Sequence, residues 1–229
     1  MKMSEDIITI KPIAHVESDF KTKFALPRQS GLASSLRSKI VFEREYSVRE
    51  AFRELDGYSH IWLIWGFSLS DKKEWSPTVR PPRLGGNKRV GVFSTRSPYR
   101  PNPLALSCVE LEKIEFKDGI AILHVLGADM ASGTPVYDVK PYLPFTDSRP
   151  DAIAGFASDV AGEALDVVFE DGRADALTED ERSSLVSVLS QDPRPHYQDD
   201  PSRIYGFDFG KYEVSFRVED GCAHVVCIK

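Results

Sequence analysis

Hydrophobic and polar residues alternate in runs of strand length along most of the first 150 residues. These runs cover residues 7–16, 60–67, 89–95, 105–116, 120–127 and 137–142. Residues 60–67 read HIWLIWGF, a continuous apolar run that predicts a strand buried on both faces. Asp-Gly pairs at 118–119 and 220–221 each separate two alternating segments, which is typical of a tight β-hairpin. Short strands with many Pro and Gly corners favour an antiparallel barrel that is closed or nearly closed.

Two segments carry signals for the start of a helix. Ser47 and Glu50, three residues apart, have the pattern of a capping box and predict a helix over residues 47–54. Thr178 is followed directly by three acidic residues, which the positive end of a helix dipole favours. This second pattern predicts a helix that ends near Ser190.

Charge divides the chain into two parts. The net charge is -6, yet residues 72–103 hold eight Lys and Arg and one acid, whereas residues 147–200 hold fourteen acids and four Arg. A turn-rich stretch at 144–150 lies between the two and is typical of a linker. We therefore predict a mainly β protein, with an antiparallel β-barrel domain over residues 1–150 and a smaller α+β domain over residues 151–229.

The composition restricts the setting in which the protein works. Hydrophobic residues make up 41% of the chain, enough for a full core, and no apolar run is long enough to span a membrane. Residues 1–16 contain acids and do not read as a signal peptide. Cys108, Cys222 and Cys227 are sparse and lack the spacing of zinc ligands. We expect a cytoplasmic protein without a membrane segment or a bound metal.

The basic stretch at residues 72–103 points to an anionic partner. Its six prolines exclude a helix and predict a rigid loop that presents arginine side chains, whose planar donors suit phosphate oxygens. The alternative is a solvated basic loop. Sequence motifs for a dinucleotide site, a P-loop or a serine nucleophile are absent. Any catalysis is therefore expected to rely on positioning and not on a covalent intermediate.

Five polar blocks lie between the apolar runs. They read ALPRQ (25–29), YSHIW (58–62), RSPYRPNP (96–103), a block from Asp129 to Pro144 that contains SGTP and DVKPYLP, and DPRPHY (192–197). These blocks resemble the TsaA/YaeB family, the tRNA methyltransferase O family, over nearly the whole chain. The resemblance implies an unusual β-barrel that binds S-adenosyl-L-methionine. It also implies a homodimer, with the site near the subunit interface, and N6-methylation of N6-threonylcarbamoyladenosine at position 37 of tRNA, in the anticodon loop.

The same resemblance assigns the contacts with S-adenosyl-L-methionine. The residues implied are Pro27, Arg28, Gln29, His60, Ile61, Arg96, Leu106, Asp129, Met130, Gly133 and Thr134. One departure is visible, because Ser132 stands where the family commonly has an aspartate. Asp129, three residues earlier, is the carboxylate that could serve instead.

Methyl transfer from a sulfonium needs two reactants held in line, with no metal and no nucleophilic side chain. Asp138 is the candidate acceptor for the N6 proton, and its alternative role is to satisfy backbone donors in a turn. Asn102 offers both a donor and an acceptor, or simply forms a turn. Tyr142 is expected to stack on a base, or to be a core tyrosine.

The remaining assignments concern tRNA. Arginines, a lysine and a tyrosine of the basic stretch are expected to contact phosphates and bases: Arg80, Arg83, Lys88, Arg89, Arg100 and Tyr99. The block at 192–197 either packs the second domain on the first or reaches a partner subunit. Two rival functions stay open: a noncatalytic β-barrel module that binds RNA or nucleotide, and an enzyme acting on a small phosphorylated metabolite.

Overall fold

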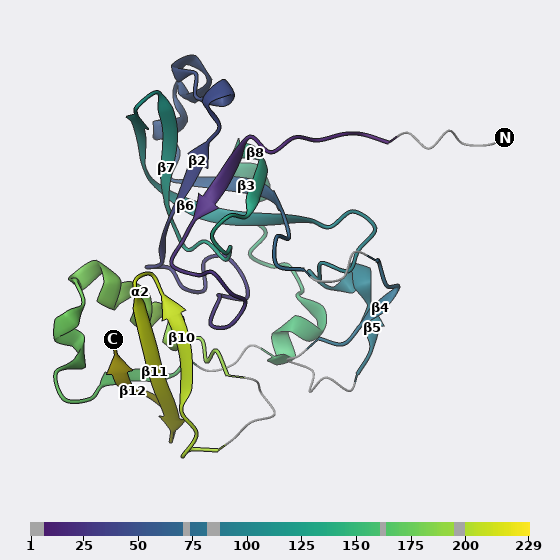
Figure 1. The fold of residues 1–229 in the computed structure, drawn as a ribbon. Coiled ribbons are helices and arrows are strands. Elements are labelled where there is room, and N and C mark those ends of the chain that lie inside the picture. Colours follow the sequence, from purple (N-terminus) through teal and green to yellow (C-terminus); the bar gives the residue numbers. More distant parts are fainter. Residues whose placement is uncertain (1–6, 71–73, 82–87, 161–163, 195–199) are drawn as a thin grey trace.

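The computed structural model describes residues 7–70, 74–81, 88–160, 164–194 and 200–229 (Figure 1). Arg83 and residues 195–197 of the DPRPHY block lie outside the described residues. None of the helices in the described part of the chain combines the length and the apolar character that crossing a lipid bilayer requires. Within the same residues, no group of His, Cys, Asp and Glu side chains is arranged to hold a metal ion.

Six antiparallel strands among the described residues close into a barrel, in the order β1-β2-β7-β6-β3-β8. Their bounds are β1 Ala14–Glu17, β2 Arg37–Phe42, β3 His60–Gly66, β6 Leu104–Lys117, β7 Ile120–Leu126 and β8 Pro135–Pro141. The long β6 pairs with β3 through its first half and with β7 through its second half. The mainly β class and the antiparallel barrel are confirmed.

Alternate residues of each strand fill the barrel. Ile40, Ile61, Leu63, Leu123 and Val125 are fully buried, and each such side chain stabilises the fold by about 1.5–3 kcal/mol. Asp118 and Gly119 at the tip of the β6–β7 hairpin both have positive φ, at 52° and 77°, as a two-residue hairpin turn requires.

The prediction that residues 60–67 are buried on both faces is wrong. Ile61, Leu63 and Trp65 are buried, whereas Trp62 and Ile64 on the other face of β3 are only half-buried. The wall of the barrel is a single sheet, so its inner face forms the core while its outer face stays open. Continuous hydrophobicity here reflects an apolar outer surface.

The prediction of a capping box and a helix at Ser47 is also wrong. The Ser47 hydroxyl donates to the Glu43 carbonyl at 3.0 Å and accepts the Ala121 N–H at 3.0 Å, so it is not available to cap a helix. The segment forms short 3-10 helices instead, at Arg44–Tyr46, Arg49–Phe52 and Leu55–Gly57.

Three other segments differ from their predicted form. The first predicted strand contracts to β1, and the 89–95 strand contracts to β5 (Val90–Gly91), which pairs with β4 (Thr78–Val79). A 3-10 helix, Val92–Ser94, follows, and it is closed by the Thr95 N–H, which donates to the Val92 carbonyl at 3.1 Å. The expected linker contains a short helix, α1 (Pro144–Asp147).

A four-stranded sheet and a helix form the second part of the described chain (Figure 1). The sheet order is β10 (Tyr205–Phe209), β11 (Tyr212–Glu219), β12 (Cys222–Ile228) and β9 (Asp166–Phe169), with β9 parallel to β12. Helix α2 (Glu179–Leu189) follows the predicted N-cap Thr178, which also forms a capping box with Glu181. The rest includes 3-10 helices at Gly155–Val160 and Arg173–Ala176.

The segment between β1 and β2 belongs to the core of this second part. Phe20, Ala25, Ala33 and Leu36 pack with α2 and the four-stranded sheet, away from the barrel core. The Phe20 ring lies 5.9 Å from the Phe209 ring. The first 40 residues therefore connect the two cores, although the sequence places them wholly in the barrel domain.

Candidate functional site

A chain of hydrogen bonds leads from the barrel core to Asp129. The Trp65 indole N–H donates to the Ser107 hydroxyl at 2.9 Å, and that hydroxyl donates to Asp129 Oδ1 at 2.6 Å. Trp65 is on β3, Ser107 is on β6, and Asp129 follows β7. Three neighbouring segments of the barrel thus hold one carboxylate.

The environment of Asp129 sets its ionisation. Burial raises the pKa of its carboxyl group above the ordinary value. The hydrogen bond from Ser107, the positive charge of Arg96 and a backbone hydrogen bond from Ser30 act in the opposite direction. The carboxylate is therefore a partly desolvated negative charge with named donors around it.

Two loops bring Arg28, Gln29 and Arg96 together. Arg96 Nη1 donates to Gln29 Oε1 at 2.5 Å, and Gln29 Nε2 donates to the Arg28 carbonyl at 2.5 Å. Arg28 Nη2 in turn donates to the carbonyl of Arg194 at 3.3 Å. With the charge of Arg96 acting on Asp129, four residues expected at the cofactor form one cluster. Pro27, next to them in sequence, is buried.

The turn after Asp129 is fixed to the end of β1. The Gly133 N–H donates to the Val16 carbonyl at 2.8 Å, and a φ of 82° explains why glycine stands there. Thr134 is buried, and its hydroxyl lies 2.9 Å from that of Ser68. Met130 is buried in the barrel core. The side chains of Met130 and Thr134 thus hold the turn, whereas Gly133 is exposed.

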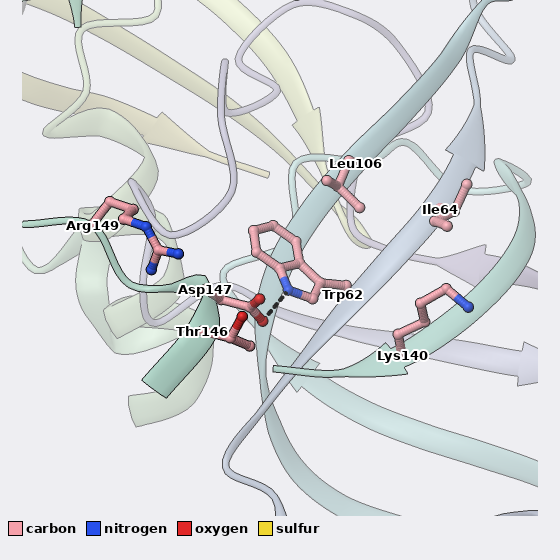
Figure 2. Close-up of a pocket in the computed structure, with 7 residues that line it drawn as sticks. All are labelled: Trp62, Ile64, Leu106, Lys140, Thr146, Asp147 and Arg149. Carbon is pink, nitrogen blue, oxygen red and sulfur yellow. Dashed lines mark hydrogen bonds between the residues drawn. The ribbon is translucent and has the colours of Figure 1, made fainter. Parts of the chain in front are cut away.

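An open hollow of about 550 Å³ lies on the outer face of the barrel wall (Figure 2). It is lined by Trp62, Ile64, Leu106, Lys140, Thr146, Asp147 and Arg149. Figure 2 shows the Trp62 indole directed at Asp147, whose Oδ2 accepts the indole N–H at 2.9 Å. The Leu143 N–H donates to the same oxygen at 2.9 Å, and the two hydrogen bonds lower the pKa of the Asp147 carboxyl group.

Other expected site residues lie around this hollow. The Tyr142 ring lies 5.7 Å from the Trp62 ring and 6.2 Å from the His60 ring. Asp138 pairs with Ile64 across β8 and β3, and its Oδ2 lies 2.7 Å from Lys140 Nζ. The Ile61 side chain is inside the barrel, so only its backbone can face a ligand here.

Both parts of the chain match models of one protein family. Residues 15–148 match the tRNA-methyltransferase O N-terminal domain, and residues 163–229 match the TrmO C-terminal domain. The chain belongs to the tRNA-methyltransferase O family. The predicted family is confirmed.

Individual relatives of tRNA-methyltransferase O type match most of the chain. The tRNA (adenine(37)-N6)-methyltransferase of Escherichia coli K12 is 38% identical over 225 residues, covering 95% of this chain and 96% of that protein. A protein of the same name from Eikenella corrodens is 47% identical over 172 residues, covering 75% and 97%. The crystal structure of TrmO from Pseudomonas aeruginosa superposes with a TM-score of 0.77 at 28% identity, covering 97% and 99%.

The basic loop of this tRNA-methyltransferase O chain is braced by two of its own arginines. Arg100 Nη1 donates to the Thr95 carbonyl at 2.8 Å, and Arg89 Nε donates to the Thr78 hydroxyl at 2.9 Å. The Ser76 N–H donates to the Tyr99 carbonyl at 2.9 Å and joins the two ends of the loop. Arg89 and Arg100 thus each use a guanidinium donor to hold the loop itself.

Three other expected RNA contacts of the loop are open to solvent or half-buried. Arg80 and Lys88 are exposed, and Tyr99 is half-buried. Asn102 is exposed, and its carbonyl accepts the Leu104 N–H at 2.7 Å in a tight turn. The Phe93 ring is 73% exposed and is an aromatic surface that the sequence did not single out.

Several residues of the site escaped the sequence analysis. Trp65 and Ser107 behind Asp129, and Asp147 and Arg149 at the outer hollow, were not proposed. A serine at an inward position of an apolar strand is a signal that could have identified Ser107. Asp147 gave no such signal, because its partner Trp62 lies 85 residues away.

Proposed function

We propose that this protein transfers the methyl group of S-adenosyl-L-methionine to N6 of N6-threonylcarbamoyladenosine at position 37 of tRNA. The observation that carries the proposal is the cluster of Arg28, Gln29, Arg96 and Asp129, assembled from three separate segments in a tRNA-methyltransferase O chain. The relatives named tRNA (adenine(37)-N6)-methyltransferase support the position of the target base.

The residues of the cluster fit the cofactor. S-adenosyl-L-methionine supplies an activated methyl group on a positively charged sulfur. The Asp129 carboxylate offers a partly desolvated negative charge for a cationic ligand, and the Gln29 amide offers a donor and an acceptor. Gly133 is exposed and has no side chain, so a ligand can approach the backbone of this turn closely. Leu106, which is 52% exposed, offers an apolar contact.

The protein's own contribution to the reaction is positioning. Alignment of two reactants can supply about 7–11 kcal/mol of a barrier without any covalent step. The hydrogen bonds among Arg28, Gln29 and Arg96 hold that cluster in one arrangement. Asp138 accepts the Val139 N–H at 2.9 Å beside its ion pair with Lys140. Its role as proton acceptor stays a prediction, as do the roles of Asn102 and Tyr142.

The tRNA contacts belong to the same proposal. Arg80, Lys88 and the aromatic surfaces of the basic loop are assigned to the phosphates and splayed bases of the anticodon loop. We also propose that the protein is a homodimer and that it works in the cytoplasm.

The test compares Arg96→Ala with Arg53→Ala, an exposed arginine on the loop before β3 that serves as a matched control. Calorimetry should show that Arg96→Ala weakens S-adenosyl-L-methionine binding by about tenfold to a hundredfold, because a hydrogen bond to a charged group is lost. Arg53→Ala should bind as the wild type does. Equal affinity of all three proteins would remove Arg96 from the site.

A methylation assay on tRNA that carries the threonylcarbamoyl group separates the rival functions. Transfer of labelled methyl and a steep loss of tRNA binding with rising salt are the expected results. Binding of tRNA without methyl transfer would favour the noncatalytic module. Salt-independent binding of a small phosphorylated compound in place of tRNA would favour the metabolite enzyme.

A further inference from the structure

Ser107 is a polar residue in an apolar wall. It is 1% exposed, and its neighbours Trp65, Leu63 and Val109 all belong to the barrel core. A buried hydroxyl lowers stability unless both its donor and its acceptor capacity are used. Both are used here, by Trp65 and Asp129.

The direction of each hydrogen bond in this chain is fixed by chemistry. An indole nitrogen can only donate, so the Ser107 oxygen accepts from Trp65. The Ser107 proton is then available for Asp129, and the short distance of 2.6 Å is typical of a donor facing a carboxylate. Trp65 therefore sets the rotamer of Ser107, and Ser107 directs its proton at Asp129 Oδ1.

We propose that Ser107, held by Trp65, is a positioning residue that aims the Asp129 carboxylate at a cationic ligand bound beside Gln29 and Arg96. The ligand is S-adenosyl-L-methionine, so this inference rests on the proposed function. Ser107 does not touch the reacting atoms and acts only through Asp129.

Positioning of Asp129 by Ser107 should make the affinity for the cofactor depend on pH. Besides the backbone N–H of Asp129 itself, the groups acting on its carboxyl group are the Ser107 hydroxyl from β6, the Arg96 guanidinium from the basic loop and the Ser30 backbone from the segment between β1 and β2. All three favour the ionised carboxylate against the effect of burial. Removing the Ser107 donor takes away one interaction that stabilises the ionised form. The pKa of the Asp129 carboxyl group should therefore rise, and Asp129 should take up a proton at a higher pH. As the solution is acidified, the affinity for a cation should therefore begin to fall at a higher pH in a protein without the Ser107 hydroxyl than in the wild type.

The experiment measures the affinity for S-adenosyl-L-methionine by calorimetry from about pH 5 to about pH 9, in the wild type and in Ser107→Ala. The pH midpoint below which affinity falls should move upward by about one unit in Ser107→Ala. The titration of the ligand itself is common to both proteins, so the difference between midpoints reports on Asp129.

Two further variants make the test specific. Trp65→Phe keeps an aromatic ring in the core but frees the Ser107 rotamer, and it should move the midpoint in the same direction by a smaller amount. Adding it to Ser107→Ala should change nothing more, because both act through one chain of hydrogen bonds. Ser184→Ala removes another buried serine, whose hydroxyl donates to the Ser35 carbonyl at 2.8 Å in the second core, and should leave the midpoint where it is.

The outcomes separate the two proposals. If the wild type binds no S-adenosyl-L-methionine at any pH, the proposed function fails. If the wild type binds S-adenosyl-L-methionine, and both Ser107→Ala and Trp65→Phe have the same pH midpoint as the wild type, the positioning role is overturned. Should Ser107→Ala not fold, as judged by circular dichroism, Trp65→Phe alone decides the question.

Discussion

Asp129 and Asp147 are two carboxylates of the barrel domain in opposite environments. Burial raises the pKa of Asp129, whereas hydrogen bonds from Leu143 and Trp62 lower the pKa of Asp147. A raised carboxyl pKa means that the ionised side chain destabilises the folded state above that pKa. A lowered pKa means that the ionised side chain stabilises it. Neutral replacements of the two residues should therefore change stability in opposite directions.

We predict that Asp129→Asn raises the free energy of unfolding at neutral pH and that Asp147→Asn lowers it. As the pH falls, wild-type Asp129 becomes protonated first, so the advantage of Asp129→Asn disappears. The deficit of Asp147→Asn disappears at a lower pH, when wild-type Asp147 is protonated in turn. Urea unfolding at a series of pH values measures both differences. A change of the same sign in the two variants at neutral pH would contradict this account.

Individual residues show how far the sequence could go. The resemblance placed Arg28, Gln29, Arg96 and Asp129 in one list, and the fold brings them together. The hydrogen bond from Ser107 to Asp129 could not be predicted from the sequence, because it depends on how β6 and the end of β7 pack together. Long-range side-chain pairs of this kind follow from packing and leave no local pattern.

At the scale of elements, local signals predicted structure well wherever the whole signal lay inside the element. The N-cap of α2 at Thr178 and the two Asp-Gly hairpins are confirmed. The Ser47 box failed because its hydroxyl bonds to Glu43 and Ala121. Strand β2 was missed although Ser38, Ile40 and Phe42 alternate inward, since two basic residues dilute its apolar pattern.

The start of α2 gives a prediction at this scale. Thr178→Ala removes the hydroxyl that accepts the Glu181 N–H at 3.3 Å, and it should lower the free energy of unfolding by about 1 kcal/mol. Ser183→Ala, at an exposed position inside the same helix, is the matched control and should be neutral or slightly stabilising. Chemical denaturation of both variants measures the difference, and equal stabilities would show that the cap contributes nothing.

On the scale of the whole molecule, the two cores share one segment. Phe20 and Leu36 are buried against the second core, yet Arg28 and Gln29 between them belong to the candidate site. The carbonyl of Arg194 adds a direct contact from beyond α2 to Arg28. The site is therefore held from both sides of the molecule, an arrangement that a boundary near residue 150 did not suggest.

We predict that Phe20→Ala lowers the free energy of unfolding by about 3–5 kcal/mol and also weakens S-adenosyl-L-methionine binding. The affinity should fall because the cavity loosens the segment that carries Arg28 and Gln29. Phe216→Ala, a fully buried residue of β11 in the same core, is the control, with a similar loss of stability and a smaller loss of affinity. Calorimetry at a temperature where both variants are folded tests this, and equal losses of affinity would contradict it.

The closed barrel and the open four-stranded sheet differ in whether their strand edges can pair with another molecule. A closed ring of strands offers no unpaired backbone to another molecule, whereas the four-stranded sheet ends at β9 and β10, which pair on one side only within the described residues. Association of molecules through added strands should therefore begin at these two margins of the sheet. Asp208 on β10 and Asp166 on β9 place exposed negative charge there, so mutual repulsion between copies should oppose such association.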